Sequence, residues 1–116
     1  MSFVLDSSVS LSWCFDDEFT DVTDALLEAL YGSGAVAPSI WPLEVLNGLA
    51  MAGRRGRIDA LKHQRLAGFL RDLPVVIDDE TASLAWTVTA QLAARFRLTL
   101  YDAAYLELAQ RRGLPL

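Results

Sequence analysis

The sequence predicts an α/β fold, a three-layer α/β/α sandwich built around a central parallel sheet. Three short apolar runs, at residues 3–5, 35–37 and 75–77, alternate with longer segments that show helical periodicity. Strands that alternate with helices pair in parallel, and helices cover both faces of such a sheet. The run at 75–77 is β-branched throughout, which favours a strand.

The N-terminal third is predicted to hold one short strand and two helices. The strand at 3–5 leads into a short helix that ends near Phe15, and an acidic loop follows at 16–18. A second helix begins at Thr20, a residue type that caps helices, or at Asp21. The inward face of this second helix is predicted to consist of Val22, Ala25, Leu26 and Ala29.

The middle of the chain is predicted to add the strand at 35–37 and two more helices. Pro42 suits the first turn of a helix, and Gly53 breaks the helical pattern. The next helix begins at Asp59 and stops before Pro74, because proline cannot continue a helix. The inward residues of the two helices are predicted to be Val45, Leu46, Leu49, Met51, Leu61, Leu66, Phe69 and Leu70.

The C-terminal third is predicted to contain the strand at 75–77 and two helices. The acidic residues 78–80 place negative charge at the start of the first helix, where the helix dipole favours it. This helix is predicted to extend to about Phe96. Thr99 caps the last helix, and Gly113 is predicted to close it in the left-handed conformation.

The composition describes a folded domain with an acidic charge balance. Of 116 residues, 53% are hydrophobic and 22% charged, so we expect one domain over residues 1–116. The net charge of −5 argues against a simple basic nucleic-acid surface, although metal ions can supply positive charge. Cys14 is the single cysteine, which excludes an intramolecular disulfide. Because no basic leader or membrane-length apolar run is visible, we expect a cytoplasmic protein.

Three acids lie where a parallel sheet binds its ligands. Asp6 follows the first strand, and Glu44 and Asp102 fall in the first turns of two helices, each among apolar neighbours. The carboxyl ends of parallel strands form the rim at which ligands bind, so these acids are candidates for one shared site. Oxygen-only ligands suit Mg²⁺ or Mn²⁺, and pairs of these ions carry out phosphoryl chemistry.

Each of the three acids also has a purely structural interpretation. Asp6 can cap the helix that follows it, and Asp102 fits a capping box with Thr99. Glu44 can be an ordinary first-turn acid that the helix dipole favours. Caps are common, so spacing alone leaves both interpretations open for each acid.

The segments around the three acids resemble those of PIN-domain proteins, and specifically the VapC family of toxin ribonucleases. They read FVLDSSV from residue 3, PSIWPLEVLNGL around Glu44 and LTLYDAAYLELAQRRGLPL around Asp102. In this order they cover nearly the whole chain. The resemblance implies an α/β/α sandwich, a divalent-metal site of clustered acids and endonucleolytic cleavage of RNA.

By position, the resemblance makes Asp6, Glu44 and Asp102 the catalytic metal ligands. It gives Ser8 the role of a hydroxyl that supports Asp6. The bound ions would activate a water and neutralise charge on the scissile phosphate. The resemblance also implies an RNA substrate, a VapB-like antitoxin as partner and a homodimer.

One departure from the family pattern concerns the end of the sequence. Family members usually continue past GLPL with a strand that bears Ser or Thr and a fourth Asp, and then a last helix. This sequence ends at Leu116, so we expect a domain without that strand and helix, with weak metal binding and low ribonuclease activity. The alternative function is a catalytically impaired binding module that mainly engages an antitoxin.

A basic stretch stands out in this acidic chain. Within RRGRIDALKHQR, Arg54, Arg55 and Arg57 are candidates for contact with the RNA backbone. A solvated turn and helix face explains the same residues somewhat better. His63 has no identifiable partner, so we expect it at the surface rather than as a general base. The residues expected to anchor the core or an interface are Trp13, Trp41 and Trp86.

Overall fold

The computed structural model describes residues 2–116 and confirms an α/β fold that is rich in helix. The strands are β1 (Phe3–Val4), β2 (Ala35–Ala37) and β3 (Val75–Ile77). The α-helices are α1 (Ser7–Ser12), α2 (Asp21–Ser33), α3 (Trp41–Arg54), α4 (Ala60–Arg71), α5 (Thr81–Leu84), α6 (Ala90–Phe96) and α7 (Leu100–Arg112). A 3₁₀ helix, η1 (Asp16–Glu18), and a π-helix, η2 (Ala85–Thr89), complete the described part.

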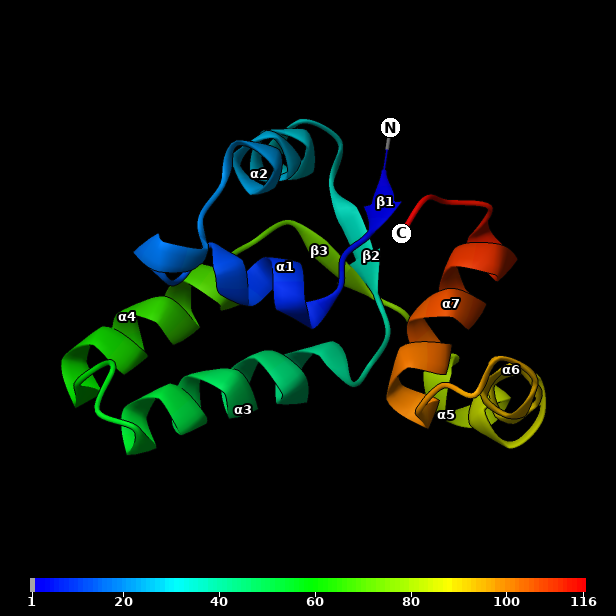
Figure 1. Ribbon diagram of the computed structural model, residues 1–116. Helices are drawn as coiled ribbons and strands as arrows, with labels where there is room; N and C mark the ends of the chain where they lie inside the picture. The colour runs from blue at the N-terminus through cyan, green and yellow to red at the C-terminus, as the bar shows by residue number, and fades with distance from the viewer. Residues whose placement is uncertain (1) are drawn as a thin grey trace.

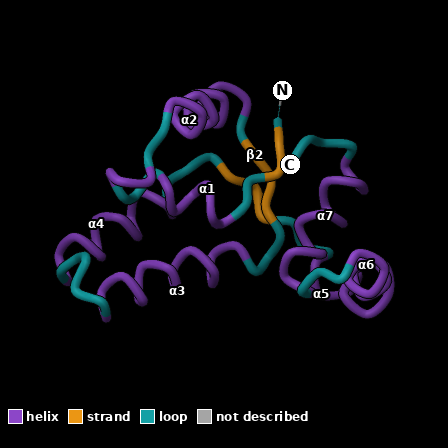
Figure 2. The backbone as a smooth tube through the Cα atoms, viewed as in Figure 1, coloured by secondary structure: helices purple, strands orange, loops and turns teal. Residues whose placement is uncertain are grey.

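Within residues 2–116, the three strands form one parallel sheet in the order β1-β2-β3. Phe3 pairs with Ala35, and Ala35 pairs with Val75, so the carboxyl ends of all three strands lie at the same rim. Figures 1 and 2 show α1 to α4 on one side of the strands and α5 to α7 on the other. The predicted parallel sheet between helices is confirmed.

One leucine from each of four helices closes the core. Leu30 of α2, Leu49 of α3, Leu70 of α4 and Leu108 of α7 are at most 2% exposed. Burying a leucine side chain stabilises a fold by roughly 1.5–3 kcal/mol. These leucines therefore hold the helices firmly against a sheet whose strands are only two or three residues long.

Helix boundaries agree closely with the prediction, but some predicted helix faces are wrong. In α2 the inward stripe consists of Leu26, Leu27 and Leu30, while Val22 is 71% exposed. Leucines bury more apolar surface than alanines, so the helix turns its leucines toward the core. The residues that were predicted to face inward and are exposed are Val22, Ala25, Ala29, Leu46, Met51 and Leu61.

The segment after β3 also differs from the prediction. The single helix predicted from residue 78 to about Phe96 begins only at Thr81, and η2 interrupts it between α5 and α6. A π-helical turn is a local widening that needs no proline or glycine, so the sequence pattern gives no sign of it. Trp86 of η2 is 87% exposed and is not part of the core, in contrast to the buried Trp13 and Trp41.

The last residues return to the sheet. Gly113 ends α7 with φ 62°, the left-handed conformation that the sequence predicted. The Val4 amide then donates a hydrogen bond to the Pro115 carbonyl at 2.8 Å, so the segment runs beside β1. No helix within residues 2–116 is long and apolar enough to cross a membrane.

Candidate functional site

Asp6 stands at the junction between β1 and α1. Its Oδ1 accepts hydrogen bonds from the Val9 amide at 2.9 Å and from the Ser8 hydroxyl at 2.8 Å. The first bond caps α1, because it satisfies an amide that has no partner inside the helix. The predicted cap is therefore confirmed. The same bonds fix the carboxylate at the rim of the sheet, which is where a ligand role would require it.

A buried serine ties α1 to α3 beneath Asp6. The Ser10 hydroxyl donates to the Asp6 carbonyl at 2.8 Å and accepts from the Trp41 indole at 2.9 Å. Trp41 is the first residue of α3, one turn before Glu44, so this chain of bonds sets the start of α3 relative to Asp6. Ser10 had no predicted role. Its position four residues after Asp6, a spacing that places a hydroxyl near the earlier carbonyl, was the available signal.

Glu44 meets α7 through Tyr105. The Tyr105 hydroxyl donates to Glu44 Oε1 at 2.6 Å, and the tyrosine is only 5% exposed. Figure 1 shows the beginning of α3 facing the orange beginning of α7, where this contact forms. Burial, and then the hydrogen bond to the Glu44 carboxylate, raise the pKa of Tyr105 well above its usual range. The phenol therefore keeps its proton and acts as a donor.

Asp102 lies in the first turn of α7 and is exposed. Thr99 caps this helix as predicted, but the cap uses the Asp102 amide, which donates to Thr99 Oγ1 at 3.1 Å. Asp102 lines a surface depression of about 360 Å³. The residues that line this depression are Asp6, Ser7, Ser8, Leu98, Asp102, Tyr105, Leu106 and Leu116.

The structure thus brings Asp6 and Asp102 to one depression, and Tyr105 links its wall to Glu44. These side chains offer oxygen atoms only, a donor set that fits Mg²⁺ or Mn²⁺. The assignment of the three acids as metal ligands remains a prediction. Tyr105 was missed from the sequence, although its position three residues after Asp102 places both on one helix face.

A second group of acids lies at the end of β3. Among residues 2–116, Asp78, Asp79 and Glu80 each offer one carboxylate oxygen that lies within 4.8 Å of the other two, and they are here called the β3 acidic group. Asp6, Glu44 and Asp102 do not form a group this tight within the same residues. The β3 acidic group was not predicted as a metal site.

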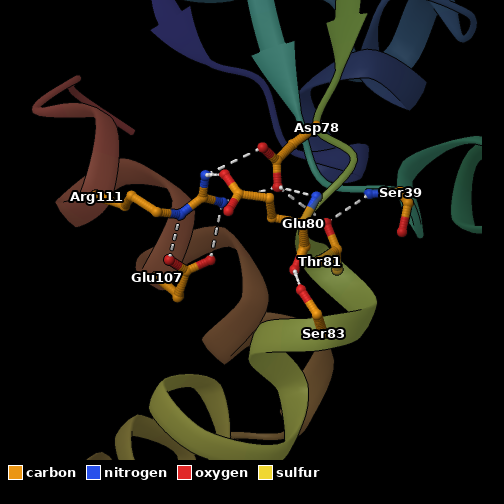
Figure 3. A network of polar contacts seen from close by, with 7 residues as sticks. All are labelled: Ser39, Asp78, Glu80, Thr81, Ser83, Glu107 and Arg111. Carbon is orange, nitrogen blue, oxygen red and sulfur yellow. Dashed lines mark hydrogen bonds and ion pairs between the residues drawn. The ribbon is translucent and has the colours of Figure 1, made fainter.

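Arg111 of α7 is paired with the β3 acidic group (Figure 3). Its guanidinium donates to Asp78 Oδ2 at 2.7 Å and to Glu80 Oε2 at 2.8 Å, and it also donates to Glu107 Oε2 at 2.7 Å. The hydrogen bond from Arg111 lowers the pKa of Asp78, and Glu107 and then Asp78 raise the pKa of Arg111. Asp78 is therefore held in an ion pair that the sequence did not predict, while residues 78–80 directly precede α5 as expected.

The basic residues predicted to contact RNA lie at the far end of α3. Arg54 follows Glu44 by ten residues, which is roughly 15 Å along a helix axis. Arg57 pairs with Asp17 at 3.0 Å, and its guanidinium lies 4.3 Å from the centre of the Phe15 ring. The structure does not bring these arginines to the depression, and their contact with RNA remains a prediction.

Comparison with known proteins places the chain in a family. A family model described as the PIN domain matches residues 3–116. No curated protein matches the chain. The matched residues include every described strand and helix, and hence the elements that carry Asp6, Glu44 and Asp102.

Proposed function

The chain belongs to the PIN domain family, and on that premise we propose that it is a VapC-type toxin of a type II toxin–antitoxin system, an endoribonuclease acting on cytoplasmic RNA. PIN domains are generally metal-dependent nucleases. The observation that carries the proposal is the depression shared by Asp6 and Asp102, with Glu44 bound to Tyr105 in its wall.

In this proposal Asp6, Glu44 and Asp102 hold Mg²⁺ or Mn²⁺. Such ions, when bound, supply an activated water and the positive charge that stabilises a phosphoryl transition state. The chain's own contribution is orientation. Ser8 and the start of α1 fix the Asp6 carboxylate, and the exposed Asp102 carboxylate leaves the depression open to an RNA phosphate.

We also propose a VapB-like antitoxin as a protein partner, and self-association into a homodimer. An apolar groove of about 660 Å³ between α3, α4 and β3 supports a protein partner. Trp41, Val45, Leu73 and Ile77 are among the residues that line it. The same groove favours the second candidate function, a catalytically impaired binding module, because docking there needs no catalysis.

A fluorogenic RNA assay with Mn²⁺, Mg²⁺ or EDTA tests the proposal. We expect slow cleavage, as the sequence predicts, that depends on either ion and that EDTA abolishes. Asp102→Asn should lower the cleavage rate roughly 100-fold or more, because it removes one of the carboxylates proposed to hold the ion that stabilises the reacting phosphate. Its fold should persist, since the Asp102 amide rather than the carboxylate takes part in the cap.

Asp79→Asn is the matched control. Asp79 is an exposed member of the β3 acidic group and does not line the depression. Asp79→Asn therefore removes the same charge as Asp102→Asn, but at a different place. We expect it to cleave RNA as the unchanged protein does. Loss of activity in Asp79→Asn, but not in Asp102→Asn, would place the metal at β3 instead. Antitoxin binding without metal-dependent cleavage would favour the binding module.

A further inference from the structure

Tyr105 occupies the point where α3 and α7 meet beside the depression. Tyr105 lines the depression together with Asp6 and Asp102, and its hydroxyl donates a hydrogen bond to Glu44 of α3. Asp102 and Tyr105 are three residues apart on α7 and so share a helix face. One side chain therefore contacts Glu44 and borders the depression that holds the other two predicted ligands.

The hydrogen bond from Tyr105 controls how Glu44 is presented. The Tyr105 hydroxyl donates to the Glu44 carboxylate at a distance of 2.6 Å, which is a short, charge-assisted hydrogen bond. Such a bond is stronger than one between neutral groups. Within residues 2–116, the Tyr105 hydroxyl is the side-chain donor to the Glu44 carboxylate. The bond engages Oε1 and leaves Oε2 for another partner, so it fixes the carboxylate without occupying both oxygens.

We propose that Tyr105 is a positioning residue, which orients Glu44 toward the depression and thereby sets the affinity of the site for a divalent ion. This inference rests on the proposed function, since it takes Glu44 to be a metal ligand. Hydrogen-bond partners of ligating carboxylates orient them, and losing such a partner typically weakens metal binding 10- to 100-fold.

The competing explanation is that Tyr105 only fills the core. Tyr105→Phe separates the two, because it keeps the buried ring and removes the hydroxyl. Calorimetric titration with Mn²⁺ should then show roughly 10-fold weaker binding than the unchanged protein. Tyr101→Phe is the matched control, because Tyr101 lies on the same helix and is 61% exposed. Removing its hydroxyl should leave the affinity for Mn²⁺ unchanged. Circular dichroism establishes that both variants fold.

A double-mutant cycle with Glu44→Gln tests whether Tyr105 acts through Glu44. If it does, adding Tyr105→Phe to Glu44→Gln should weaken Mn²⁺ binding no further. An additive loss, or a Tyr105→Phe affinity equal to that of Tyr101→Phe, would overturn the inference while the proposed function stands. Absence of Mn²⁺ binding by the unchanged protein would overturn the proposed function and this inference with it.

Discussion

At the scale of single residues, Asp6 is an observed helix cap that was also predicted to be a metal ligand. Its Oδ1 holds the first turn of α1 through the Val9 amide, at the rim where the predicted metal ligands lie. The structural and functional interpretations are therefore compatible for this residue. Two substitutions separate its contributions, because asparagine can cap a helix and alanine cannot.

Asp6→Asn should leave the free energy of unfolding within about 0.5 kcal/mol of the unchanged protein, because Asn caps a helix about as well as Asp. Asp6→Ala should lower the free energy of unfolding by about 1 kcal/mol or more, since the Val9 amide loses its hydrogen-bond partner. Both should weaken Mn²⁺ binding. Urea denaturation and calorimetric titration measure the two effects, and undiminished Mn²⁺ affinity in Asp6→Asn would reduce Asp6 to a cap.

At the scale of elements, the close approach of α1 and α3 sets the spacing between Asp6 and Glu44. Gly48 of α3 lies directly against Leu11 of α1: a Cβ added there would be 2.4 Å from Leu11 Cδ1. Gly53, on the same helix, has open space around its Cα. The absence of a side chain at position 48 therefore allows the helices to approach.

Gly53→Ala should raise the free energy of unfolding by up to about 1 kcal/mol, through helix propensity alone. Gly48→Ala has the same gain in helix propensity, but its new methyl group must displace the Leu11 side chain. The Gly48→Ala protein should therefore be about 1–3 kcal/mol less stable than Gly53→Ala. Urea denaturation of the two variants gives this difference directly. Equal stabilities would mean that Leu11 moves aside freely and that Gly48 does not govern the helix spacing.

At the scale of the whole molecule, Arg111 joins the C-terminal helix to the far edge of the sheet. Its partners Asp78 and Glu107 have side chains that are 3% and 4% exposed. Because Arg111 lowers the folded-state pKa of Asp78, the stability from this pair is present above the unfolded pKa of an aspartate. It is lost as the pH falls through the folded pKa.

Arg111→Met should lower the free energy of unfolding by about 3–5 kcal/mol at neutral pH, because it leaves two buried carboxylates without their cation. Without Arg111, burial would raise the folded pKa of Asp78, so the variant should recover stability as acid protonates this carboxylate. The difference in free energy of unfolding between the variant and the unchanged protein should therefore narrow in mild acid. Urea denaturation from neutral to mildly acidic pH measures this difference. Arg112→Met is the control, because Arg112 is exposed. A gap that is constant with pH would contradict an electrostatic role.

The local sequence by itself determined the order and boundaries of most elements. The caps at Thr20, Asp59 and Thr99 each bond an amide three residues ahead, and Gly113 ends α7 through its own backbone conformation. Such signals depend only on neighbouring residues, so they can be recognised in one dimension. The positions of Asp6, Glu44 and Asp102 on these elements followed for the same reason.

Which side chains meet depends on how distant elements pack in the folded chain. Tyr105 bonds to a residue 61 positions away, and Arg111 pairs with Asp78 across 33 positions. Spacing along the chain carries no information about such contacts, because they depend on how helices pack against the sheet. The same packing turned the leucines of α2 inward and placed Asp78 in a buried ion pair. Sequence specified the elements locally, whereas the hydrogen bond to Glu44 and the ion pair of Asp78 exist only once distant elements have packed together.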